Sequence, residues 1–392
     1  MKKSTLILSL LPVFLGFFVM GFVDVVGIAT NYFKDTYGLS ERLSGFLPSM
    51  IFIWFLVFAI PSATLMNKIG RKNTVLLSML VTIIGMFLPF TMIANLTLSI
   101  CIVAFCLLGI GNTILQVSLN PLVSNVVEGK YLASSLTAGQ VVKALCAFCA
   151  PLITTFAATQ LGNWMYIFPI FGGITLLAAL WLLLTPIKKE EPSTSASFID
   201  SFKLLGNKII LMLFIGILVV VGIDVGVNMV SVKVLINHFD YNANDVYWGP
   251  MTYSLCRTIG AFIGAALLAK MNEMKYFRIH VLLALVVIGL LLVAPSDTMA
   301  YVLFGAIGYA FSSIFSIIFS VAMKARPDKT NEVAGLMVTA IAGGAIFPPI
   351  MTFANSLFSD TKQYGAIIVL MLITCYLVYL AFAFLSKKKV EN

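Results

Sequence analysis

The sequence predicts an all-α membrane protein, with twelve transmembrane helices in two pseudo-symmetric six-helix bundles. The first observation is composition: hydrophobic residues make up 60% of the 392 residues, and charged residues only 10%. A soluble domain cannot bury so much apolar surface. The second is a series of apolar segments, each long enough for the roughly 20 helical residues that cross a bilayer. The third is a weak internal repeat at an offset of about 200 residues.

The apolar segments are separated by short polar breaks. The first, MKKSTLILSLLPVFLGFF, resembles a secretory signal, but the apolar run continues through Thr30 without a small-residue cleavage site. We therefore interpret it as a retained first span. The predicted spans are 7–33, 43–67, 74–94, 98–126, 133–160, 165–186, 209–234, 246–270, 279–295, 298–323, 333–358 and 363–386.

The longest polar interruption divides the chain into two halves of six spans. It predicts an N-terminal bundle at 1–187, a cytoplasmic linker at 188–208 and a C-terminal bundle at 209–392. Four short matches occur in the same order in both halves, among them GFVDVVG with VGIDVGV and GIGNTILQ with AIGYAFSS. Secondary transporters use duplicated six-helix halves to build a central site that opens to either side of the membrane.

The basic residues predict the orientation. With both termini in the cytoplasm, 19 of the 25 Lys and Arg residues fall inside, and only Lys34, Arg42 and Lys362 lie in outer loops. This is the positive-inside bias. The net charge of +9 therefore reflects topology and anionic lipid headgroups, not nucleic-acid binding. We expect a monomeric, multi-pass protein of a bacterial inner membrane.

Catalytic and metal chemistry find little support in the sequence. All six cysteines lie within predicted spans, where thiols usually pack as small apolar side chains. The two histidines lie near span ends, which leaves few ligands for a metal ion. We expect no metal and no cofactor. A membrane enzyme, the alternative from another class, should show clusters of His, Asp or Cys at the aqueous interface.

Four ionisable residues lie near the middle of predicted spans: Asp24, Lys143, Asp224 and Arg257. At roughly 2.5 to 3.5 kcal/mol each, they would together cost about 10 to 14 kcal/mol in lipid. They must therefore face an aqueous cavity or each other. We hypothesise that Asp24 pairs with Lys143 and that Asp224 pairs with Arg257.

These pairs are candidates for proton coupling, because a carboxylate that separates from its partner can take up or release a proton. The alternative is that they are structural ion pairs that only hold helices together. Coupling is favoured for Asp24. The two interpretations are nearly balanced for the second pair, because Arg257 never releases its proton and suits a static clamp.

Polar side chains without charge predict the kind of substrate. Asn112, Gln116 and Asn120 recur every four residues and so share one helix face. Amides and hydroxyls offer paired donors and acceptors to a polyhydroxylated ligand such as a sugar. The alternative, favoured for the serine row of span 10, is hydrogen bonding between packed helices. The candidate substrate-binding residues are Trp54, Asn112, Gln116, Asn120, Gln140, Asn228, Tyr309 and Ser313.

Proline and glycine predict interruptions within several spans. The segment AGGAIFPP in span 11 contains Gly343, Gly344, Pro348 and Pro349. Such residues weaken backbone hydrogen bonding, and the resulting bends act as gates in transporters. We assign a gating role to this segment only.

These residues together resemble the major facilitator superfamily, and within it the fucose and glucose/galactose proton symporter group, over essentially the full chain. ATLMNKIGRK at 63–72 is similar to the superfamily signature G-x-x-x-D-R-x-G-R-R. Gly70, Arg71 and Lys72 match this gating motif, whereas Ala63 and Asn67 replace the usual Gly and Asp. With that Asp missing, only the basic residues remain to bind carbonyls at helix ends.

The resemblance also carries over to the span residues. Asp24 occupies the place of the group's acid on span 1, and Gln140 matches its glutamine on span 5. Gln116 replaces an acid on span 4, and Lys143 replaces a neutral amide, so the coupling apparatus differs from that of the group. The resemblance implies a sugar importer that uses a proton or sodium ion. The alternatives are a facilitative sugar uniporter and a proton-coupled exporter of small molecules.

Overall fold

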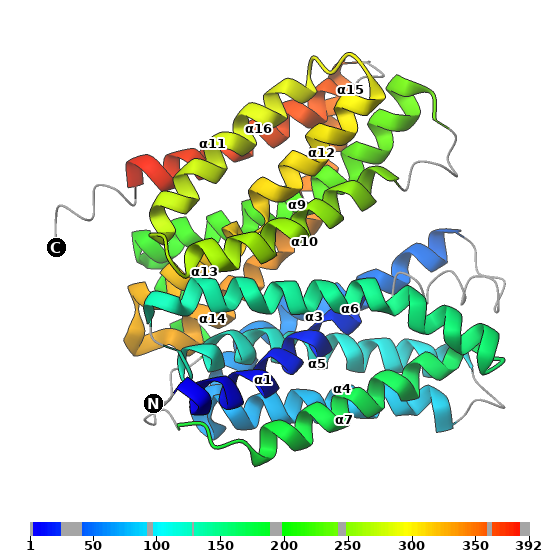
Figure 1. Cartoon of the computed structure of the whole chain (residues 1–392), viewed down its shortest axis with the longest axis vertical. Helices are drawn as coiled ribbons and strands as arrows, with labels where there is room; N and C mark the ends of the chain where they lie inside the picture. The colour runs from blue at the N-terminus through cyan, green and yellow to red at the C-terminus, as the bar shows by residue number, and fades with distance from the viewer. Residues whose placement is uncertain are drawn as a thin grey trace. The chain divides into compact units, whose positions relative to one another are not determined.

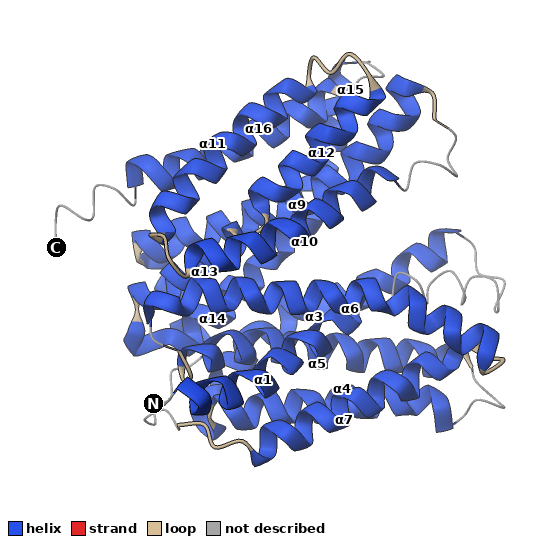
Figure 2. Ribbon diagram, in the orientation of Figure 1, coloured by secondary structure: helices blue, strands red, loops and turns tan. Residues whose placement is uncertain are grey.

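The computed structural model describes residues 3–24, 41–91, 97–127, 129–188, 198–241, 248–358 and 363–384. All regular structure in these residues is helical (Figure 2). Nine of the described helical stretches are long and apolar enough to cross a membrane. The remaining predicted spans, the first, second and fifth, correspond to α1 (Lys3–Met20), α3 (Glu41–Ile69) and α6 (Leu132–Gln160). The predicted all-α membrane fold is confirmed, and each of the twelve predicted spans corresponds to a described helical segment.

The first of two compact units comprises Met1–Leu132, Gly139–Leu204 and Arg326–Thr339. Within it, α5 packs against α1, α3 and α4, and α4 also packs against α7 (Figure 1). A short helix, α14, adds to α3 and α5. Its other helices are α4 (Arg71–Thr91), α5 (Leu98–Ser124), α7 (Ile167–Leu184), α8 (Phe198–Lys203) and α14 (Thr330–Thr339), and a 3₁₀ turn, Gly21–Asp24, follows α1.

The second unit comprises Ala133–Ala138, Leu205–Ala325 and Ala340–Asn392. Here α12 packs against α10 and α11, and α9 packs against α13, α15 and α16 (Figure 1). Its helices are α9 (Lys208–Phe239), α10 (Trp248–Leu268), α11 (Glu273–Leu291), α12 (Asp297–Phe311), α13 (Ile314–Ala325), α15 (Gly343–Phe358) and α16 (Tyr364–Tyr379), which continues as a π-helix over Leu380–Phe384.

Three predicted spans are interrupted. The α-helix of the first span ends at Met20 and gives way to the 3₁₀ turn that contains Asp24. Span 10 is divided into α12 and α13. Span 11 is divided by a 3₁₀ turn, Ala340–Ala342, directly before Gly343. A side chain at Gly343 would collide with the carbonyl group of Leu218 in α9, so glycine is needed where these helices touch. The predicted interruption of span 11 is present, and its gating role stays a prediction.

Large apolar side chains remain exposed on both units. The exposed fraction is 83% for Leu184, 70% for Phe262 and 71% for Val293. Many further leucine, isoleucine and phenylalanine side chains on other helices are similarly exposed. Hydrocarbon chains, unlike water, cover such surfaces without cost, and a helix satisfies its own backbone polar groups. The surface is therefore that of a multi-pass membrane protein.

Candidate functional site

One of the two predicted ion pairs is formed in the second unit. Arg257 on α10 places Nη1 3.2 Å from Oδ2 of Asp224 on α9. The side chains are 38% and 25% exposed, respectively, so neither is sealed inside the helix packing. The pair shows how two mid-span charges avoid lipid: each supplies the counter-charge of the other. Whether the pair takes part in coupling stays a prediction.

Sequence reasoning missed a third member of this cluster. The hydroxyl of Tyr253 donates a hydrogen bond to Oδ1 of Asp224 at 2.7 Å. Tyr253 lies one helical turn before Arg257, so both donors project from the same face of α10. Tyrosines are frequent in apolar helices, and this one attracts no notice in the sequence. Its spacing of four from Arg257 is the only signal, and that spacing alone is weak.

The predicted binding residue Asn228 lies one turn after Asp224. Its Nδ2 donates to the backbone carbonyl of Asp224 at 2.7 Å, and its own carbonyl accepts from Ser231. The amide is therefore tied to its own helix in this conformation. A role in substrate binding stays a prediction.

The other predicted pair can be examined only through its backbone, because the side chain of Asp24 lies outside the described residues. Gly21, in the 3₁₀ turn that contains Asp24, lies directly against α6. A Cβ atom on Gly21 would come 2.7 Å from the carbonyl oxygen of Lys143 and 2.6 Å from Cβ of Cys146. The turn that carries Asp24 thus packs on the turn that carries Lys143, which is the arrangement that the pairing hypothesis requires.

The amide row on α5 is buried and hydrogen bonded. Asn112 donates to the carbonyl oxygen of Met20 at 2.7 Å, and Gln116 donates to Oδ1 of Asn112 at 2.8 Å. Asn120 donates to the backbone carbonyl of Gln116, while its own Oδ1 has no partner among the described residues. The row therefore fixes the end of α1 to α5. These contacts agree with the helix-packing alternative, and substrate binding by the row stays a prediction.

Two further binding candidates of the first unit are only partly buried. Gln140 lies one turn before Lys143 on α6. Trp54 on α3 packs edge-on against Phe58, with ring centroids 5.6 Å apart. The indole Nε1 of Trp54 is buried without a hydrogen-bond partner in the described part of the chain. A buried donor of this kind is suited to a ligand hydroxyl.

The candidates of span 10 pack against α11. The hydroxyl of Ser313 lies 3.4 Å from that of Tyr276, and the ring of Tyr309 lies 5.6 Å from that of His280. His280 and Tyr276 are stacked, with centroids 3.7 Å apart. Ser313 is fully buried. These are contacts between packed helices, the interpretation favoured for this serine row from the sequence.

Comparison with known proteins decides the family. The family model described as the Major Facilitator Superfamily matches residues 13–349 of the chain.

The chain belongs to the major facilitator superfamily.

Similar proteins support this assignment along the whole length. A glucose/galactose transporter of Brucella abortus is 25% identical over 355 residues, covering 85% of this chain and 84% of its own. A putative glucose/galactose transporter of Helicobacter pylori is 24% identical over 419 residues, covering 100% of both chains. Both similar proteins are transporters and not enzymes.

Solved structures show the same fold. The E. coli fucose:proton symporter FucP has a TM-score of 0.81 at 18% identity, covering 96% of this chain and 98% of its own. The proton:xylose symporter XylE, bound to 6-bromo-6-deoxy-D-glucose, has a TM-score of 0.75 at 11% identity, covering 98% and 96%. The major facilitator fold that the sequence predicts is confirmed.

The superfamily signature lies at the junction of α3 and α4. Gly70 adopts a left-handed conformation, with φ of 84°, and so links the two helices at a residue without a side chain. Lys72 donates to the carbonyl oxygens of Leu183 and Thr185 at 2.9 Å each. This is the binding of helix-end carbonyls by a basic residue that the sequence predicts.

Arg71 is the centre of the signature cluster. It is buried and donates to the carbonyl of Pro121 and the hydroxyl of Ser124 at the end of α5. Its Nε also donates to Oδ1 of Asn331 at 2.7 Å. Asn67, in place of the usual Asp, donates to Oε1 of Glu332 at 2.8 Å. Glu332 on α14 is thus an acid in direct contact with the motif.

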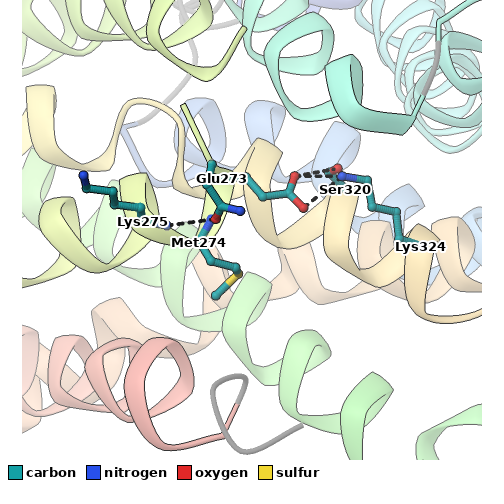
Figure 3. Close-up of polar contacts among 6 residues, drawn as sticks. Glu273, Met274, Lys275, Ser320 and Lys324 are labelled. Carbon is teal, nitrogen blue, oxygen red and sulfur yellow. Dashed lines mark hydrogen bonds and ion pairs between the residues drawn. The ribbon is translucent and has the colours of Figure 1, made fainter. Parts of the chain in front are cut away.

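The corresponding loop of the second unit uses the opposite charge. Glu273, the first residue of α11, accepts two hydrogen bonds of 2.9 Å from Lys324 near the end of α13 (Figure 3). Ser320 lies 3.4 Å from the same carboxylate. In the first unit, a basic residue at the start of α4 binds the end of α5; here an acid at the start of α11 binds the end of α13.

Proposed function

We propose that this chain imports a sugar, a monosaccharide or a short oligosaccharide, by symport with a cation, which we expect to be a proton. The match that carries the proposal is the putative glucose/galactose transporter of Helicobacter pylori, which aligns with 100% of both chains. The two solved structures named above are proton symporters for fucose and xylose and share the fold. Both termini are expected in the cytoplasm of a bacterial cell.

Coupling requires that substrate movement and charge movement depend on each other. In our proposal, Asp24 leaves Lys143 when the site opens outward, and one of its carboxylate oxygens takes up a proton. The neutral carboxyl group costs less free energy in a low-dielectric site than a carboxylate without a counter-charge. The packing of Gly21 against the Lys143 turn supports this pair, because it places the two backbones in contact.

Substrate recognition is proposed for the uncharged polar residues. Trp54 offers an apolar ring and a buried N–H, and Asn120 offers a carbonyl oxygen; neither polar atom has a hydrogen-bond partner among the residues that the structure describes. Stacking on an aromatic ring and hydrogen bonding to hydroxyls are the two contacts that a pyranose makes. Gln140, Asn228 and Tyr309 are proposed as further contacts to the same class of ligand.

Purified protein in sealed liposomes tests the proposal. Radiolabelled glucose, galactose, fucose and a disaccharide are offered with an imposed pH gradient, with an imposed sodium gradient, and with neither. We expect one monosaccharide to accumulate above its outside concentration only with the pH gradient, and the accumulation to collapse on adding a protonophore.

The other results separate the alternatives. Accumulation driven by sodium alone would replace the proton as the coupling ion. Equilibration that ignores both gradients would identify a facilitative uniporter. Extrusion of a non-sugar against its gradient, with no uptake of any sugar, would contradict import and indicate an exporter.

A further inference from the structure

The carboxylate of Asp224 is held by two donors of different kinds. Tyr253 binds Oδ1 at 2.7 Å, and Arg257 binds Oδ2 at 3.2 Å. Because these donors lie four residues apart on α10, a single helix turn occupies both oxygens of a carboxylate on α9. The neutral phenol therefore shares the anion with the charged guanidinium, and each contact can persist without the other.

Burial distinguishes the two donors. Tyr253 is 1% exposed, whereas the side chain of Arg257 is 38% exposed. A hydroxyl inside the packing has no water to turn to, so losing the carboxylate would leave it as an unsatisfied donor. A guanidinium on a long, partly exposed side chain can turn toward water or toward another acceptor. Tyr253 is thus the fixed partner of Asp224, and Arg257 the exchangeable one.

Helix packing holds Tyr253 where it is. Gly308 on α12 lies so close to the carbonyl group of Tyr253 that no side chain would fit between them. One turn earlier, a Cβ atom on Gly305 would lie 2.9 Å from Sγ of Cys256. The turn of α10 from Tyr253 to Arg257 is therefore pressed against α12 through two glycines, and the backbone that carries the phenol has little room to shift.

We propose that Tyr253 is a positioning residue for transport: it holds the Asp224 carboxylate as an anion while Arg257 releases it and binds it again in each cycle. This rests on the proposed function, in which mid-span ion pairs separate as the site changes its access. It assigns the moving part to the arginine, and it explains how an acid in the middle of a span remains in place while it is without its counter-charge.

The decisive experiment compares Tyr253→Phe, Arg257→Met and the double variant in thermal unfolding and in sugar exchange. Each single variant leaves one donor on the anion. The double variant leaves none, so we expect it to lose more than the two single losses combined, with an unfolding temperature lowered by at least a few degrees beyond their sum. Adding Asp224→Asn removes the charge and should restore much of that loss.

Transport gives the second readout. Tyr253→Phe should lower gradient-driven accumulation by about tenfold, the scale of a hydrogen bond to a charged group, while exchange of sugar at equal concentrations falls less. The matched control is Tyr376→Phe, which removes a phenol donor to the Met212 carbonyl on the same helix, α9, but far from Asp224 along it. The control should leave the ratio of accumulation to exchange unchanged.

Each outcome is informative. Strictly additive losses of stability in the Tyr253 and Arg257 variants would overturn the inference. So would a double variant, folded or unfolded, whose stability does not recover when Asp224→Asn is added. So would a Tyr253→Phe variant that behaves like Tyr376→Phe. If non-additivity and recovery are found but accumulation never depends on a gradient, the proposed symport is wrong, and Tyr253 holds the carboxylate in a transporter of another kind.

Discussion

Two aspartates in the middle of spans are placed by different means. Asp224 is held by Arg257 and Tyr253 on the neighbouring helix α10. Asp24 follows a helix end, and the backbone of its turn packs against the turn of α6 that carries Lys143. An arginine keeps its charge in every state, whereas a lysine and an aspartate can both change theirs. We therefore place the proton on Asp24 and a positional role on the Asp224 cluster.

Replacing Asp24 by Asn tests this assignment. The amide keeps the shape of the carboxylate but cannot carry a proton on and off. We expect Asp24→Asn to abolish uphill sugar accumulation in liposomes and to leave exchange across the membrane partly intact. Asp328→Asn is the control, because Asp328 is an exposed acid that pairs locally with Arg326. Uphill uptake by Asp24→Asn at the rate of the unaltered protein would rule out Asp24 as the coupling group.

The sequence identified these charged residues because the cost of a mid-membrane charge can be read along the chain. It paired Arg257 with Asp224 by counting one acid and one base in each half, and the structure shows that contact. It did not find Tyr253, since the partner of a tyrosine hydroxyl in a membrane span depends on how the helices are rotated against one another.

At the scale of elements, the end of α1 is a junction with two other helices of the first unit. The carbonyl of Met20, where the α-helix gives way to a 3₁₀ turn, accepts a hydrogen bond from Asn112. On the other side, Gly21 touches α6 at Lys143 and Cys146. Three helices thus meet at one turn, and the direction in which Asp24 leaves α1 depends on that meeting.

A methyl group at Gly21 should therefore disturb the site. Gly21→Ala brings a carbon 2.7 Å from a backbone oxygen of α6, which cannot rotate away as a side chain can. We expect a loss of about 1 to 3 kcal/mol of stability and a loss of accumulation. Gly173→Ala on α7 is the control, since a Cβ there meets nothing within 4 Å. It should be neutral or slightly stabilising. Equal unfolding temperatures for the two variants would contradict the close approach.

The link between α11 and α13 permits a charge-exchange test. Glu273 is at the start of α11 and Lys324 is in the last turn of α13. Each charge is therefore also stabilised by the dipole of its own helix. Glu273→Lys should destabilise by about 1 kcal/mol, because two lysines then face each other at a partly exposed site. Adding Lys324→Glu should recover only part of this, since both charges then lie at the wrong helix ends.

Thermal unfolding in detergent measures this exchange. Lys270→Glu, an exposed change in the same loop, serves as the control for altered surface charge and should change the unfolding temperature little. If the unfolding temperature of the double variant is no higher than that of Glu273→Lys alone, the two side chains do not interact in the folded protein.

For the whole molecule, the distribution of Lys and Arg predicts that both termini are cytoplasmic. Fusions test this directly. Green fluorescent protein at the C-terminus should fluoresce, and alkaline phosphatase at the same place should be inactive. Alkaline phosphatase joined after Tyr241, which follows α9, should be active because that loop is expected outside. The reverse pattern of activities would invert the topology.

The sequence by itself determined the class of molecule and identified the four costly charges, and it predicts twelve spans in two halves. These follow from length, hydropathy and charge, which are properties of consecutive residues and require no knowledge of neighbours. The prolines and glycines of span 11 likewise predict an interruption, which the structure places at Ala340–Ala342.

Only the tertiary structure decided which donors meet which acceptors. Arg71 finds Asn331, and Asn67 finds Glu332, across more than 250 residues of sequence; Tyr253 finds Asp224 across 29. The amides of α5, expected to line a cavity, are found bonded to their own helix and to α1. A polar side chain can satisfy itself in many ways, and the rotation and contact of whole helices select among them.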